Sequence, residues 1–238
     1  MQYRKQLVVN IPKVVMPLIG INILVFILQN VFGASFTDLF VLNTATVFST
    51  PWTLVTSMFL HGGFNHILFN MYALMMFGPL IERKIGSKKF LQMYFVSGIL
   101  ASLGFVLYSN MIVGTSALAL GASGAIMGVL GMTIMLLPKM RVLFFFVIPM
   151  SMRTAGIIFA AVDLLGLIGI GGSGIANSAH LVGLAVGLLY AKYLLVENKK
   201  FYQEFAKPYN IRSTNKAHSK AIELSEQDVE NYLKKGRL

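Results

Sequence analysis

The sequence contains no cysteine, and only 12% of its 238 residues are charged. The absence of cysteine excludes disulfide bonds, thiol catalysis and cysteine metal sites. Soluble domains carry about a quarter charged residues. The low charge, 56% hydrophobic residues and a mean hydropathy of +0.71 therefore exclude an ordinary soluble protein. The composition predicts a protein with several membrane spans.

Six apolar stretches are each close to the roughly 20 residues that cross a hydrocarbon core of ~30 Å. They cover residues 14–32, 64–81, 89–109, 121–137, 155–170 and 176–195. The expected fold is an all-α membrane protein, a bundle of six transmembrane helices with both termini on one side. We expect a membrane domain over residues 1–196 and a cytoplasmic tail over 197–238. The tail is expected to be partly disordered, with a short helix beginning near Ser225.

Lysine and arginine are missing from residues 33–52, 110–120 and 171–175. They gather instead in the connections at the other ends of the spans, for example at Lys13, Arg83, Lys139, Arg153 and Lys192. By the positive-inside rule the three segments without them face outward, and both termini are cytoplasmic. The net charge of +11 then indicates contact with anionic lipid headgroups rather than with nucleic acid.

A short motif, Gly121-Ala122-Ser123-Gly124, opens the fourth stretch. Gly124 and Gly128 are spaced so that one face of a helix lacks side chains, which lets a neighbouring backbone approach closely. A polar group is costly inside a membrane, and this favours a functional serine. Taken alone, however, the motif is more typical of small residues that only pack helices together.

His180 lies near the outer end of the sixth stretch, with Gly183 and Gly187 on its own helix face. We expect Ser123 and His180 a few residues inside the outer boundary, about 5–10 Å deep at ~1.5 Å per residue. An isolated histidine in a membrane is also typical of a proton relay or a metal ligand. The matched depth favours a general base that activates a serine nucleophile.

The second stretch adds another polar face. His66 and Asn70 are four residues apart, so they stack on one side of a helix, also at its outer end. Imidazole and amide N–H groups are donors that stabilise an oxyanion in acyl transfer, and the backbone N–H of Ser123 is a further candidate. Hydrogen bonds that only hold helices together are the alternative for Asn70 and the favoured interpretation for His61.

Three segments therefore occur together: His61–Asn70 (HGGFNHILFN), Gly121–Gly124 (GASG) and Ala179–Gly187 (AHLVGLAVG). In combination they resemble the rhomboid intramembrane serine proteases. The resemblance covers residues 50–195 and keeps the family's order on the second, fourth and sixth spans. Three coincident motifs make it specific.

The resemblance implies a six-helix bundle of rhomboid type, with a cavity open to the outer face and a Ser-His dyad. Ser123 would be the nucleophile and His180 the general base. Residues lining the oxyanion site would be His66, Asn70 and Gly121, with His61 as a further candidate. Glycines that pack the helices would be Gly124, Gly128, Gly183 and Gly187. We expect no cofactor and no metal ion.

In such proteases the substrate is typically the transmembrane segment of another protein. A peptide bond can be attacked only where its helix is locally unwound, so helix-destabilising residues should favour cleavage. The expected partners are therefore membrane-protein substrates and the lipid bilayer.

Two positions depart from the family pattern. Many bacterial members carry Trp-Arg in the first outer loop, whereas this chain has Trp52-Thr53, which puts the anchoring of that loop in question. Some members have an aromatic residue four positions after the serine, where this chain has Met127; sulfur can also contact a ring edge. Neither position holds a reacting group.

Asp163 is the one acidic residue that lies well inside the expected spans. A Ser-His-Asp triad is one interpretation. From the expected span ends, however, Asp163 sits several residues deeper than His180. This favours a buried, hydrogen-bonded or protonated carboxyl group outside the reacting unit.

Two other functions compete with proteolysis. A catalytically silent rhomboid-like protein would bind membrane segments, but such relatives usually lack the serine or the histidine, and both are present here. A transporter would line a route across the bilayer, whereas these polar residues cluster at one depth. We expect a multi-pass protein of a prokaryotic plasma membrane, because no organelle-targeting segment is seen.

The topology can be tested cleanly because the chain has no native cysteine. Single cysteines at Asn110 and Ser173 should react with a membrane-impermeant thiol reagent added outside intact cells, and one at Ser87 should not, because the positively charged connections stay inside. The opposite labelling pattern would overturn the orientation.

Overall fold

The computed structural model describes residues 12–144, 147–170 and 174–205. The longer helices are α1 (Val15–Phe32), α4 (Phe64–Ile85), α5 (Ser87–Leu107), α6 (Ser123–Leu136), α7 (Met152–Leu167) and α8 (Gly174–Phe205). A π-helical turn, Tyr108–Val113, extends α5. The chain divides into two units, Met1–Ala191 and Lys192–Leu238. The short helix expected near Ser225 lies outside the described residues.

Short elements complete the described chain. Two helical segments, α2 (Ala34–Phe40) and α3 (Thr53–Thr56), precede a 3₁₀ turn, η1 (Ser57–Phe59). Strand β1 (Leu42–Asn43) pairs antiparallel with β2 (Leu118–Ala119), and β3 (Arg141–Phe144) pairs antiparallel with β4 (Ile148–Ser151).

Among the described residues, four segments are helical, long and apolar enough to cross a membrane: Val15–Phe32, Phe64–Ile85, Ser87–Val113 and Gly174–Glu197. Helix α6 is apolar but has only 14 residues, which at ~1.5 Å per residue gives about 21 Å, less than a ~30 Å hydrocarbon core. Each of the six expected stretches overlaps a helix. Length and composition thus support four of the six expected spans.

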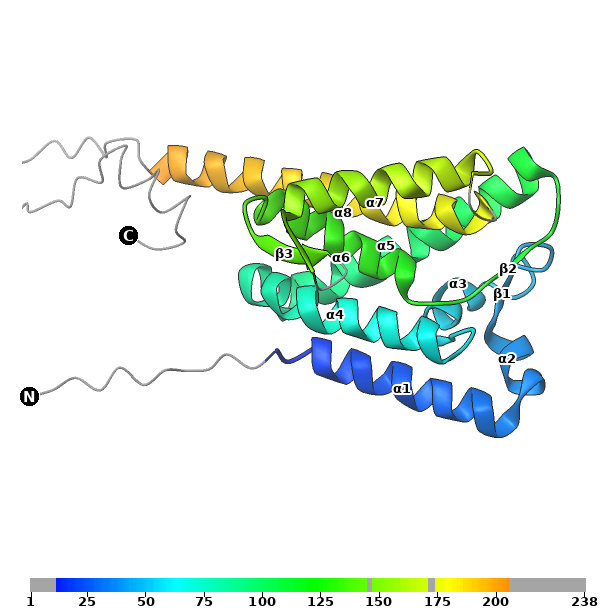
Figure 1. Cartoon of the computed structure of the whole chain (residues 1–238). Helices are drawn as coiled ribbons and strands as arrows, with labels where there is room; N and C mark the ends of the chain where they lie inside the picture. The colour runs from blue at the N-terminus through cyan, green and yellow to red at the C-terminus, as the bar shows by residue number, and fades with distance from the viewer. Residues whose placement is uncertain (1–11, 145–146, 171–173, 206–238) are drawn as a thin grey trace, which may run out of the picture. The chain divides into compact units, whose positions relative to one another are not determined.

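Helix α6 lies at the centre of the first unit. It packs against α4, α5 and α7, and its glycines meet α8. Figure 1 shows α1 running beside α4, and α7 beside α8. The side chains of Ser123 and His180 therefore come from two helices that touch directly.

The contact between α6 and α8 is made by backbone atoms. A methyl group added to Gly183 would lie 2.1 Å from the carbonyl oxygen of Gly124, and one added to Gly187 would lie 2.0 Å from that of Gly128. Both distances are far below van der Waals contact. Only glycine at these positions allows the observed helix separation.

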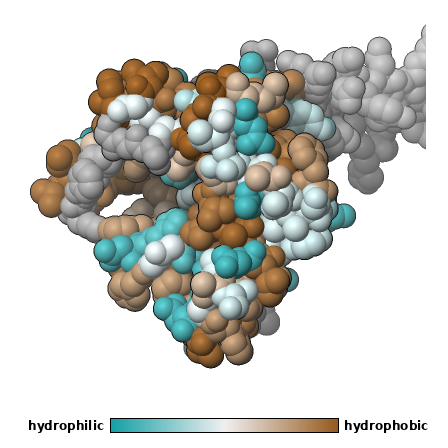
Figure 2. Space-filling view, turned by 90° about the vertical axis from the view of Figure 1, so that its right-hand side faces the viewer, coloured by the Kyte–Doolittle hydropathy of each residue, from teal (hydrophilic) through white to brown (hydrophobic). Residues whose placement is uncertain are grey.

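The connection between α1 and α4 is folded rather than extended. The rings of Phe36 and Phe40 lie 4.9 Å apart, and the indole N–H of Trp52 donates to the carbonyl oxygen of Leu39 at 3.3 Å. Trp52 thus anchors this connection through its indole N–H, with threonine at the next position. Figure 2 views this end of the molecule and shows hydrophilic residues interspersed among hydrophobic ones.

Glu82 fixes the opposite end of α4 to the start of α1. Its buried carboxylate accepts the backbone N–H groups of Lys13, Val14 and Val15 at 2.8, 3.0 and 3.1 Å. The hydroxyl of Ser87 donates to the same group at 2.6 Å. A carboxylate on a neighbouring helix therefore satisfies N–H groups that a helix start leaves without intrahelical partners.

We expect Gly183→Ala to destabilise the fold, because its methyl group would collide with the Gly124 carbonyl. The free energy of unfolding in detergent should fall by about 1–3 kcal/mol, the usual cost of overpacking. Gly20→Ala in α1 is the matched control, since nothing lies within 4 Å of its added methyl group. Equal stability of the two variants would contradict a backbone-limited α6–α8 contact.

Candidate active site

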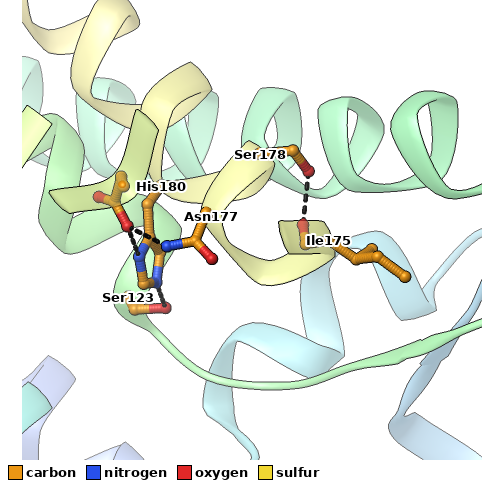
Figure 3. Close-up of polar contacts among 6 residues, drawn as sticks. Ser123, Ile175, Asn177, Ser178 and His180 are labelled. Atoms are coloured by element: carbon orange, nitrogen blue, oxygen red, sulfur yellow. Dashed lines mark hydrogen bonds and ion pairs between the residues drawn. The ribbon is translucent and has the colours of Figure 1, made fainter. Parts of the chain in front are cut away.

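The side chains of Ser123 and His180 are in direct contact. The Oγ atom of Ser123 lies 2.9 Å from Nε2 of His180, and Figure 3 shows the two side chains pointing toward each other. The imidazole side chain is 30% exposed, so the pair is shielded but accessible. A serine hydroxyl at this distance from an unprotonated imidazole nitrogen can lose its proton as it attacks a carbonyl carbon.

Ser123 is the first residue of α6, two residues later than the expected start of that helix. The first N–H groups of a helix have no intrahelical partner, and they carry the positive end of the helix dipole. Negative charge that develops beside Ser123 would therefore be stabilised by the start of α6. His180 lies six residues into α8, about 9 Å at ~1.5 Å per residue.

Asp163 contacts His180, and the expectation that it sits too deep was wrong. Its Oδ1 atom lies 3.0 Å from Nδ1 of His180 and accepts the side-chain N–H of Asn177 at 2.8 Å. The error came from the helix ends. Helix α7 ends at Leu167 rather than residue 170, and α8 begins by Gly174 rather than 176, so Asp163 and His180 lie at similar distances from the turn between them. Asp163 is buried and hydrogen-bonded, as expected.

Sequence reasoning also missed Asn177. It precedes His180 by three residues, so the two side chains lie on one face of α8. That spacing was the only signal in the sequence, because asparagine is common in helix–helix contacts without any chemical role.

His66 lies against Gly121, two residues before Ser123. The backbone N–H of Gly62 donates to Nδ1 of His66 at 3.2 Å, so in the neutral ring Nε2 carries the hydrogen. A methyl group added to Gly121 would lie 2.9 Å from this Nε2 atom, and Gly121 has a positive φ of 124°. Both space and backbone conformation thus require glycine, and an N–H donor faces the segment that leads into Ser123.

Asn70 and His61 both contact His66. The buried Asn70 donates one amide hydrogen to the carbonyl oxygen of His66 at 2.8 Å. The backbone N–H of His61 donates to the side-chain oxygen of Gln29 at 2.8 Å, and the His61 ring packs against that of His66. Burial, with a smaller effect of the neighbouring His66, lowers the pKa of His61 to about 4. His61 is therefore neutral near pH 7, which fits a packing role.

A cavity of about 250 Å³ adjoins Ser123 and His180. Most residues around it are small, and they come from η1, α5, β2, the start of α6 and α8: Ser57, Gly98, Ala101, Ser102, Ala119, Gly121, Gly124, Ala125, Ala176 and Ala179. The cavity can take a side chain placed next to the serine. Within the part of the chain that the structure describes, no cluster of three or more His, Asp or Glu residues could hold a metal ion.

Comparison with known proteins adds an independent finding. The family model described as the rhomboid domain matches residues 49–197. A protein named as a rhomboid protease, YdcA of Bacillus subtilis (strain 168), is 32% identical over 149 residues. The match covers 63% of this chain and 69% of YdcA. The rhomboid protease GluP of the same strain is 35% identical over 144 residues, 60% of this chain and 26% of GluP.

A mitochondrial relative is also similar. Rhomboid protein 1, mitochondrial, of Saccharomyces cerevisiae is 33% identical over 183 residues, 74% of this chain and 52% of the yeast protein. The chain thus spans about half of this relative and about a quarter of GluP.

Proposed function

The chain belongs to the rhomboid family, and from this membership we propose that it is an intramembrane serine endopeptidase. The observation that supports the proposal most directly is the 2.9 Å contact between Ser123 Oγ and His180 Nε2. A family member that had lost catalysis would have no need to keep a nucleophile and a base in hydrogen-bond contact at a helix start.

The proposed reaction proceeds through an acyl-enzyme. Ser123 Oγ attacks the carbonyl carbon of a peptide bond, and His180 Nε2 takes the hydroxyl proton and then gives it to the leaving amine. Water attacks the resulting ester, again with His180 as the base, and releases Ser123. No cofactor is needed for either step.

The negative charge of each tetrahedral intermediate needs hydrogen-bond donors. The backbone N–H groups at the start of α6 are one source, since Ser123 is the first residue of that helix. The Nε2–H group of His66, which lies against Gly121, is another candidate donor. Asn70 is a further candidate, because only one of its two amide hydrogens is bonded to its own helix.

The proposed substrates are membrane proteins whose transmembrane segments contain helix-destabilising residues. The residue before the cleaved bond would place its side chain in the 250 Å³ cavity beside Ser123. The proposal includes six spans, cytoplasmic termini and an outward-facing site in a prokaryotic plasma membrane. In this arrangement α6 and α7 are short spans. The connection before Ser123 occupies the part of the membrane thickness that α6 is too short to cross.

Ser123 and His180 should act as one catalytic unit. Ser123→Ala, His180→Ala and the double variant should each lower kcat/KM on a model transmembrane substrate by at least about 1000-fold and to a similar extent, because removing either partner disables the other. A fluorophosphonate should label Ser123 in the wild type and react far more slowly with His180→Ala.

Ser178→Ala is the matched control for that series. This buried serine on α8 donates to the carbonyl oxygen of Ile175 at 2.6 Å and points away from Ser123 in Figure 3, so its variant should keep wild-type activity. Cleavage by folded Ser123→Ala at a rate near wild type would refute the protease assignment.

The oxyanion donors should act mainly in the transition state. His66→Ala and Asn70→Ala should each lower kcat about 10- to 1000-fold with a smaller effect on KM. Steady-state kinetics on a fluorogenic transmembrane peptide in detergent would measure both constants. Unchanged turnover of a folded double variant would remove the two residues from the site.

A further inference from the structure

We propose that Asp163 is a positioning residue for His180, so that this chain works with a Ser-His-Asp unit in which Asn177 holds the carboxylate. The proposal rests on the proposed protease function. It adds to that function a third side chain that the Ser-His dyad of the family does not require.

The contacts fit one tautomer of His180. An ionised carboxylate only accepts hydrogen bonds, and Asp163 Oδ1 lies 3.0 Å from Nδ1 of His180. With Asp163 ionised, the imidazole hydrogen therefore sits on Nδ1. Nε2 is left with a lone pair that faces the Ser123 hydroxyl at 2.9 Å. This is the tautomer that a general base needs.

A second contact holds the carboxylate itself. Asn177 donates to the same Oδ1 atom at 2.8 Å, so Asp163 receives hydrogen bonds from two residues on one face of α8. In Figure 3 the dashed lines from Asn177 and His180 run to the same side chain, which the hydrogen bonds identify as Asp163. Two donors from a rigid helix restrict the carboxylate in both position and rotation.

Space for this arrangement is provided by Gly166. A methyl group added to Gly166 would lie 2.6 Å from the amide atoms of Asn177. Gly166 follows Asp163 by three residues, so both lie on the face of α7 that meets α8. Asn177 on α8 therefore packs against Gly166 on α7 while its amide group binds Asp163 on the same helix as Gly166.

The arrangement has a consequence for the proton transfer. Asp163 is 6% exposed, and an isolated charge at such a site is costly. When His180 takes the Ser123 proton, the ring becomes a cation next to this carboxylate, and their hydrogen bond strengthens. The proton stays on His180 and Asp163 remains ionised, so the carboxylate stabilises the charge that develops in the transition state.

The positioning role can be distinguished from a purely structural role, in which Asp163 only ties α7 to α8, by measuring the tautomer of His180. Histidine ¹⁵N chemical shifts of the wild type in detergent should show His180 with its hydrogen on Nδ1. The chain has four histidines, and the signal missing from His180→Ala identifies the ring. A wild-type ring with its hydrogen on Nε2 would overturn the proposal, whatever the activity.

Kinetics of two Asp163 variants complete the test. Asp163→Leu removes the acceptor at similar volume and should lower kcat about 100- to 10,000-fold with little change in KM, because the carboxylate does not touch the substrate. Asp163→Asn removes the charge and can turn an amide N–H toward Nδ1, which favours the wrong tautomer, so its kcat should fall to a similar extent. Folding is checked by thermal unfolding, and Ser178→Ala is again the control. Should Asp163→Leu fail to fold, Asp163→Asn and the wild-type spectrum still decide.

The two proposals fail separately. If folded Asp163→Leu and Asp163→Asn keep kcat within about threefold of wild type while Ser123→Ala is inactive, the positioning role is wrong and the protease assignment stands. If fluorophosphonate does not label Ser123 and no substrate is cleaved, the protease assignment fails and the positioning role fails with it.

Discussion

The backbones of α6 and α8 touch without side chains between them, and the geometry of the site depends on this contact. A serine side chain is short, so its hydroxyl reaches an imidazole on another helix only if the two axes come unusually close. Glycine at positions 183 and 187 permits that approach, since a methyl group there would collide with carbonyl oxygens of α6. The 2.9 Å Ser123–His180 contact is a result of helix packing as much as of the two residues themselves.

Buried polar side chains on three of the described helices bind groups on other elements. The Glu82 carboxylate binds the start of α1, Gln29 on α1 binds the backbone of His61, and Asp163 on α7 binds α8. In apolar surroundings an unpaired polar group is costly, so each pair restrains two elements at once. The second pair fixes the turn before α4, and with it the placement of His66.

Sequence motifs predicted that Ser123 and His180 lie together, and the structure brings them into contact, because glycine spacing and helix periodicity survive small errors in helix limits. The predicted depth of Asp163 relative to His180, in contrast, was wrong because the helix ends were misplaced. Three residues at the end of α7 and two at the start of α8 decide whether these side chains lie at one depth. Hydropathy cannot locate those ends, since glycine and apolar residues continue through the turn. Likewise, nothing in the sequence showed that α6 begins at Ser123 itself.

For the proposed protease, the dimensions of the site would constrain how a substrate is cut. A helix with its side chains is about 10–12 Å across, and a cavity of about 250 Å³ admits a side chain but not a helix. Within a helix, moreover, each carbonyl oxygen already accepts a backbone hydrogen bond, so it is not free for the donors at the start of α6. Both restrictions are removed when a few residues of the substrate unwind. Under the proposed function, selection by helix instability would therefore follow from the geometry around Ser123 without a sequence-specific pocket.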